Sequence, residues 1–339
     1  MSNDFTQTVA VIVSHVNSVR TIDRCLQHLL NQDYPLNLLN IIVVDGGSTD
    51  GSIEAVRQTE RRGVRQILSP GCSEAEGHII GIRATESEVI MFTNSDIYVP
   101  KDWVRKHVEW QAKGYDLVGG RVFWGGDKFA FAWNMPMQNA PKFIQQEGLG
   151  LGFSNCSFKS ELFSRVGGLK NLRSQHDTEF AFRAVTMGSR MILDPEIEVY
   201  HDHPFKSYKL SFMRSFGYTL NHVIVMRSSY GRIVSGSGSP AMVPVSTLLK
   251  EWFLLNGIKV YRELYFKGLK SGIRVGLPEF LFIRMVSREL GLLIGAFVGA
   301  IRPRVTLLSI SDLHGNRKTF SSDRNYSQMS NQIRLVGFD

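Results

Sequence analysis

The chain has 339 residues, of which 43% are hydrophobic and 21% are charged, a composition that fits a folded protein with a sizeable core and excludes a disordered one. The net charge of +8 favours anionic partners, but no zinc-finger spacing or arginine-rich block supports nucleic acid as one of them. The three cysteines are widely spaced and form no CxxC site, and no signal peptide is visible, so we expect a reducing, cytoplasmic location.

The N-terminal part alternates between apolar runs and amphipathic segments. Continuous apolar residues predict buried strands over 9–14 and 40–44, and helical spacing of apolar residues predicts helices over 21–32 and 52–61. This β-α-β-α order predicts an α/β fold whose sheet is largely parallel, with right-handed crossovers.

A glycine-rich polar loop, DGGSTDG, follows the second predicted strand. Its glycines let the backbone approach a ligand, and Asp45 at the strand end is placed to accept hydrogen bonds from a nucleobase or ribose. Asp50 has two interpretations, ligand contact or capping of the next helix. The spacing matches neither G-x-G-x-x-G nor GxxxxGK[ST], so a phosphate-binding loop of those kinds is excluded.

The apolar run 89–92 stops abruptly at Asn94-Ser95-Asp96. Ligands of open α/β sheets bind at the carboxyl ends of the strands, so two oxygen donors there are placed to share a divalent cation and, through it, a diphosphate. The alternative is an ordinary turn, because Asn, Ser and Asp are common turn residues.

The second half of this region adds two further groups. Asp177 falls in the first turn of a predicted helix, where it is either a general base or a charge favoured by the helix dipole. A strand is predicted over 190–193. His201 and His203 then follow at a spacing that places both on one face of a strand, as metal ligands or as surface residues. Residues 124–150 have no clear period, which is typical of a functional loop or small subdomain.

Five groups of segments occur in an order that, taken together, resembles the family 2 inverting glycosyltransferases of the GT-A fold. They are IVSHVN, VVDGGSTDGS, GIRATESEVIMFTNSD, the pair FSRVGGL and HDTEFAFRA, and VYHDHP. The resemblance extends from about Val9 to about Arg227. It implies a mixed, mostly parallel sheet flanked by helices, and an enzyme that transfers a sugar from a nucleotide-diphosphate donor to an acceptor hydroxyl with inversion.

The resemblance also implies roles for individual residues. Asp177 stands at the position of the catalytic base, and Asp45 at that of the nucleobase or ribose contact. Asn94 and Asp96 stand at the two positions of the Asp-x-Asp motif that binds Mg²⁺ or Mn²⁺, with His201 completing the metal or diphosphate site. The predicted donor-binding residues are Ser14, Asn17, Asp45, Gly47, Ser48, Asn94, Ser95 and Asp96.

The chain departs from the family pattern at four places. Gly46 replaces an acid, Asn94 replaces the first acid of the metal motif, and His176 replaces the Glu before the base. Gly77-His78-Ile79 replaces an Ala-Arg-Asn triplet, which removes a donor-binding Arg. These changes motivate an alternative function, a non-catalytic relative that binds a nucleotide sugar and assists a partner glycosyltransferase.

The C-terminal third falls outside the resemblance. We predict a catalytic domain over 1–227, a helical region over 228–314 and a polar tail over 315–339, with a Gly/Ser-rich linker over 230–240. Helices are predicted over 243–266 and 278–301. The charge-free run 290–301 is too short to span a bilayer. These helices either lie on the cytoplasmic face of a membrane or pack on the catalytic domain or a second copy of the chain. The family's acceptors make a glycan or lipid-linked acceptor the expected partner.

Overall fold

The computed structural model describes residues 6–124, 143–145, 151–172, 174–203 and 207–234, together with 286, 287, 289–291, 293 and 294. Its strands are β1 (Val9–His15), β2 (Leu39–Asp45), β3 (Val64–Leu68), β4 (Val89–Thr93), β5 (Ile97–Tyr98), β6 (Leu117–Trp124), β7 (Phe143–Gln145), β8 (Cys156–Lys159) and β9 (Met191–His201). Its α-helices are α1 (Ile22–Leu30), α2 (Ser52–Arg57), α3 (Glu74–Arg83), α4 (Trp103–Ala112), α6 (Ser160–Arg165), α7 (His176–Thr186) and α8 (Tyr208–Val234), and short 3₁₀ turns occupy Leu36–Leu38 and Glu60–Arg62.

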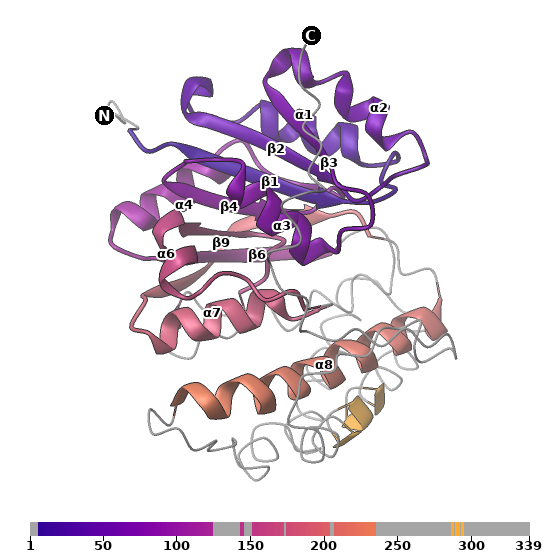
Figure 1. The fold of residues 1–339 in the computed structure, drawn as a ribbon, viewed down its shortest axis with the longest axis vertical. Coiled ribbons are helices and arrows are strands. Elements are labelled where there is room, and N and C mark those ends of the chain that lie inside the picture. The colour runs from indigo at the N-terminus through magenta and orange to yellow at the C-terminus, as the bar shows by residue number, and fades with distance from the viewer. Residues whose placement is uncertain are drawn as a thin grey trace, which may run out of the picture.

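The described strands form one mixed sheet in the order β3-β2-β1-β4-β8-β6-β9-β5, and β7 pairs with β9 (Figure 1). The four strands at one end, β3-β2-β1-β4, are parallel, as the β-α-β-α alternation predicts. β8 runs antiparallel to both of its neighbours, β4 and β6, while β6 and β9 are parallel. The predicted α/β class is therefore confirmed.

Apolar side chains fill both faces of this sheet. Along β1, Val9, Val11 and Val13 face one core, and Ala10 and Ile12 face the other, because successive strand residues point to opposite faces. The first core is covered by α1, α2 and α4, and the second by α3, α6 and α7. Burial on both faces explains why β1, β2 and β4 are continuous apolar runs.

The strand predicted over 190–193 extends further than the sequence indicates. β9 runs from Met191 to His201, and its pairing with β6 shifts register where Gly120 pairs with Asp194 and Arg121 with Glu198. Pro195 lies within this irregularity. Because proline has no N–H to donate to the ladder, a bulge lets the strand pass it without ending.

The C-terminal predictions are tested only in part. α8 continues to Val234, so the first residues of the linker predicted over 230–240 are helical, which corrects that prediction. α7 lies between the sheet and α8 (Figure 1), and such tertiary packing stabilises a helix despite a residue of low propensity such as Gly231. The helix predicted over 243–266, the tail over 315–339 and most of 125–150 and 278–301 lie outside the described residues. No helix in the described ranges is long and apolar enough to cross a bilayer.

Candidate active site

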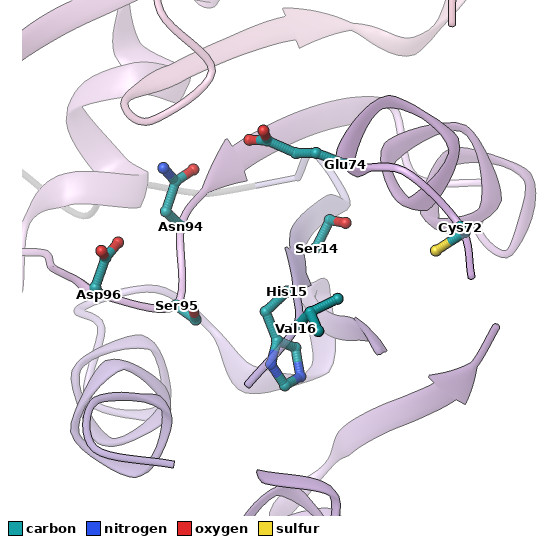
Figure 2. Close-up of a pocket in the computed structure, with 8 residues that line it drawn as sticks. All are labelled: Ser14, His15, Val16, Cys72, Glu74, Asn94, Ser95 and Asp96. Carbon is teal, nitrogen blue, oxygen red and sulfur yellow. The ribbon is translucent and has the colours of Figure 1, made fainter. Parts of the chain in front are cut away.

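A cleft opens where strands β1 and β4 end and helix α3 begins (Figure 2). Its volume is about 310 Å³, and it is lined by Ser14, His15, Val16, Cys72, Glu74, Asn94, Ser95 and Asp96. Four of the predicted donor-binding residues, Ser14, Asn94, Ser95 and Asp96, therefore share one cavity. β1 and β4 are parallel neighbours, so their carboxyl ends meet at one edge of the sheet.

The other four predicted donor-binding residues lie in or against the loop after β2: Asp45 ends β2, Gly47 and Ser48 are in the loop, and Asn17 contacts it from the segment after β1. The Asp45 carboxylate is fully buried, and its Oδ1 accepts hydrogen bonds from the backbone N–H groups of Gly47 and Ser48, each at 2.7 Å. Asn17, which follows β1, holds the same loop through two hydrogen bonds. Its backbone N–H donates to Ser48 Oγ at 2.8 Å, and its side-chain Oδ1 accepts from Thr49 N at 2.8 Å. In this structure the Asp45 carboxylate holds the backbone of the loop through these hydrogen bonds, and its direct contact with a nucleobase stays a prediction.

Asp50 serves the helix that follows the loop. Its Oδ1 accepts from the N–H of Ser52, the first residue of α2, at 3.0 Å, and its Oδ2 accepts from Val19 N at 3.0 Å. These bonds satisfy a free N–H at the start of α2, so of the two interpretations of Asp50 the structure favours capping.

Asp96 meets two histidines at the far side of the cleft. The two-residue strand β5 pairs antiparallel with the end of β9 and sets Ile97 opposite His201. His201 Nε2 then lies 3.0 Å from Asp96 Oδ1, and His203 Nδ1 lies 3.0 Å from Asp96 Oδ2. The ligand atoms of these three residues all lie within 4.8 Å of one another, which is close enough to hold one metal ion. The three residues are called the Asp96 group below.

Hydrogen bonding keeps Asp96 ionised. Burial opposes the charge, but the hydrogen bonds from His201 and His203 outweigh it and hold the pKa of Asp96 well below its usual value. Arg214, on α8, contacts His203 Nε2. Because a guanidinium only donates hydrogen bonds, Nε2 is the acceptor, and His203 Nδ1 carries the proton donated to Asp96.

His201 and Asn94 are the other two predicted metal ligands. His201 is buried against Trp124, with ring centroids 3.9 Å apart, and its Nδ1 has no hydrogen-bond partner within the described ranges. Asn94 is held by a hydrogen bond from its Nδ2 to Ser154 Oγ at 3.3 Å. The structure thus places His201 directly against Asp96, and it places Asn94 on the same cleft wall.

The predicted base, Asp177, is the second residue of α7 and does not line the cavity. Its Oδ1 accepts from Thr178 N at 2.7 Å, and its side chain is half-buried. A Cβ added to Gly152 would lie 4.0 Å from Asp177 Oδ2, so this oxygen faces backbone that carries no side chain. The helical first-turn position predicted for Asp177 is confirmed.

The pKa of Glu74 depends on charges from both the Asp96 group and the start of α7, where Asp177 lies. Solvent reaches its side chain through the cleft, yet the surrounding protein raises the pKa of Glu74 by desolvation. His176 and His201 oppose this rise, while the carboxylates of Asp177 and Asp96 add to it. Glu74 lines the same cavity as Asp96, and its ligand atom lies within 4.8 Å of that of His176, the residue before Asp177.

Sequence reasoning missed two residues of the site and gave only a weak indication of a third. Glu74 and Arg214 carry no local signal, because each is an ordinary charged residue on a helix. His203 lies two residues beyond the end of β9, and only its spacing from His201 indicated a role. All three come into the site through contacts between segments far apart in the chain.

Comparison with known proteins agrees with this geometry. Residues 10–166 match the model of Glycosyl transferase family 2. That match covers just under half of the chain. A mannosyltransferase from Pyrobaculum calidifontis, solved with GDP-Man and Mn²⁺, superposes with a TM-score of 0.60 over 88% of each chain at 20% identity. This likeness confirms the GT-A fold.

Two relatives show how similarity is distributed along this chain. It is 30% identical over 121 residues to Glycosyltransferase AglE of Haloferax volcanii, a match that covers 34% of this chain and 39% of AglE. It is 24% identical to the undecaprenyl-phosphate 4-deoxy-4-formamido-L-arabinose transferase of Photorhabdus laumondii, over 91% of this chain and 92% of the relative. Similarity to AglE is thus confined to about a third of this chain, whereas similarity to the arabinose transferase extends through most of it.

Proposed function

We propose that this family 2 domain is an inverting glycosyltransferase that moves a sugar from a nucleoside-diphosphate donor to an acceptor hydroxyl. One observation carries the proposal. A cleft at the carboxyl ends of β1 and β4 has a carboxylate–imidazole group, Asp96 with His201 and His203, on one wall, and Glu74, which also lines the cleft, lies beside His176, the residue before Asp177 on α7. A negatively charged donor and a hydroxyl acceptor need these two kinds of group facing each other.

Asp177 acts as the base. An acceptor hydroxyl is a weak nucleophile near neutral pH, and a carboxylate that takes its proton during attack lowers the barrier. Attack from the side opposite the nucleoside diphosphate inverts the anomeric carbon. The carboxylate Oδ2 lies near Gly152, so no side chain at that position covers it. Thr178 N orients the other oxygen.

The Asp96 group fits a divalent cation. It offers an ionised carboxylate and two imidazoles within 4.8 Å of one another, and each imidazole would give up the proton it donates to Asp96 in order to coordinate the ion. Two nitrogen ligands suit a transition-metal ion such as Mn²⁺ better than Mg²⁺, which prefers oxygen. When bound, such an ion neutralises charge on the leaving diphosphate. Asn94 is the neighbouring oxygen donor.

Arg214 supplies a second positive charge to this wall. This chain lacks the Arg that the family pattern has at the Gly77-His78-Ile79 position, whereas Arg214 reaches the Asp96 group from α8 through His203. Burial lowers the pKa of Arg214 and nearby Asp96 opposes that shift. A guanidinium remains charged in proteins, so we assign it a role in holding the donor diphosphate.

The acceptor we propose is a glycan or a lipid-linked sugar carrier, because the P. laumondii relative, similar over nearly its whole length, is named for transfer to undecaprenyl phosphate. A lipid-linked acceptor would bring the protein to a membrane surface. Donors to test first are GDP-mannose and UDP-GlcNAc, the ligands of two solved structures with this fold.

The deciding experiment compares wild-type protein with Asp177→Asn. Binding of each nucleotide sugar with Mn²⁺ is measured by thermal shift and calorimetry, and transfer by release of nucleoside diphosphate. We expect Asp177→Asn to abolish transfer, by at least about 100-fold, and to leave donor binding within about twofold. Wild-type turnover in the Asn variant would refute the base assignment. Donor binding without transfer or hydrolysis in the wild type would instead favour the non-catalytic relative.

A further inference from the structure

A second group of potential ligands lies beside the cleft, at the start of two helices. Glu74 and His78 are four residues apart on α3, so they lie on the same face of that helix. His176 is the first residue of α7. The ligand atoms of these three residues all lie within 4.8 Å of one another.

The two histidines of this group are buried without partners. His78 is 1% exposed and His176 is 5% exposed. Both ring nitrogens of His176 and the Nδ1 of His78 have no hydrogen-bond partner in the described part of the chain. Buried polar atoms are normally satisfied, and His107 shows this in the same protein, since each of its nitrogens contacts a polar side chain. The unpaired nitrogens therefore point to a ligand.

Aromatic side chains surround the pair. The imidazole rings of His78 and His176 have centroids 5.5 Å apart. The ring of Phe92 lies 4.3 Å from that of His78, and the ring of Phe153 lies 5.4 Å from that of His78 and 5.3 Å from that of His176. Apolar walls offer water few partners, and they limit competition for the imidazole nitrogens. Glu74 closes the group on the side that faces the cleft.

These two histidines are also departures from the family pattern. His78 stands in place of the Arg of the Ala-Arg-Asn triplet, and His176 in place of the Glu before the base. A guanidinium and a carboxylate attract each other by opposite charge, whereas two imidazoles have no such attraction. The two replacements lie on different helices and meet in space, which is what a shared ligand would require.

We propose that Glu74, His78 and His176 form a binding site for a transition-metal ion of the Zn²⁺ class, distinct from the Asp96 group. Two imidazoles and one carboxylate are a common three-residue ligand set for Zn²⁺, and the fourth position is left to water. The carboxylates of Glu74 and neighbouring Asp177 offset the partial positive charge at the two helix N-termini.

The test uses the full chain, freed of any histidine tag, and counts bound metal. Zn²⁺ is measured by calorimetry and equilibrium dialysis. Co²⁺ is measured by its visible absorption, whose intensity rises when the ion is held in tetrahedral coordination. The Asp96→Asn variant serves as the background, so that binding at the Asp96 group is weakened and the remaining site is seen alone.

In that background we expect one equivalent of Zn²⁺ or Co²⁺, and we expect His78→Gln, His176→Gln and Glu74→Gln each to weaken binding at least about 100-fold, since loss of an outer-sphere partner alone costs 10–100-fold. Glu86→Gln, which removes an exposed carboxylate after α3, is the matched control and should bind like the background. Glu74 is exposed, so metal binding can be measured in Glu74→Gln even where a variant of a buried histidine fails to fold. Unchanged stoichiometry and spectrum in Glu74→Gln would overturn the proposal.

Discussion

A buried polar network around Asn155 and His107 should make the protein sensitive to acid. Asn155 Nδ2 donates to two backbone carbonyls, and its Oδ1 accepts from Trp103 Nε1 at 2.8 Å and from His107 Nε2 at 3.1 Å. His107 Nδ1 lies 3.0 Å from Ser157 Oγ, so it accepts from that hydroxyl. Burial lowers the pKa of His107 from 6.5 to about 4, although Asn155 and Asp194 oppose the shift.

The sign and size of the effect follow from linkage. Above pH 6.5 the imidazole is neutral in both the folded and the unfolded chain and has no effect on stability. Below pH 6.5 the unfolded chain binds a proton that the folded chain does not, so the free energy of unfolding falls. For a folded pKa of about 4, the loss is about 2 kcal/mol at pH 5 and approaches about 3 kcal/mol at pH 4.

The assay is urea unfolding of the wild type and of His107→Gln, each at about pH 7.5 and about pH 5. The Gln variant lacks the titrating group, so its loss of stability between the two pH values should be smaller than the wild-type loss by about 2 kcal/mol. Ser157→Ala is the control, because it removes a network partner but no titrating group and should keep the wild-type pH dependence. Equal pH dependence in wild type and His107→Gln would refute the reasoning.

Three further predictions concern the cleft and its support. Asp96→Asn should remove the Mn²⁺ dependence of nucleotide-sugar binding, because it neutralises the charged ligand of the Asp96 group, and calorimetric titrations identical with and without Mn²⁺ in the wild type would contradict this. Arg214→Ala should weaken donor binding about 10- to 100-fold, consistent with about 1.5–3 kcal/mol for a hydrogen bond to a charged group, while Arg214→Lys should recover part of it. Gly81→Ala should lower the free energy of unfolding by about 1–3 kcal/mol, since the new methyl would overlap Cγ2 of buried Ile12; a more stable variant in urea would show that α3 moves away from β1 at little cost.

The local pattern of apolar and polar residues was sufficient to predict much of the fold of this protein. The apolar runs at Val9, Leu39 and Val89 predicted the parallel strands, because a strand buried on both faces must be apolar at successive positions. The polar residues directly after them, including Asp45 and Asp96, were predicted at the sheet edge because strand ends are read directly from the sequence.

Only the tertiary structure decided which of these residues meet. Asp96 contacts His201 because β5 pairs with the end of β9, and strand pairing depends on register between distant segments rather than on local composition. The Asp194–Glu198 bulge, the approach of Arg214 from α8 and the meeting of His78 with His176 have the same origin. Local sequence pattern thus accounts for the strands and their polar ends, whereas long-range packing accounts for the composition of the Asp96 group and for the meeting of the second group of ligands.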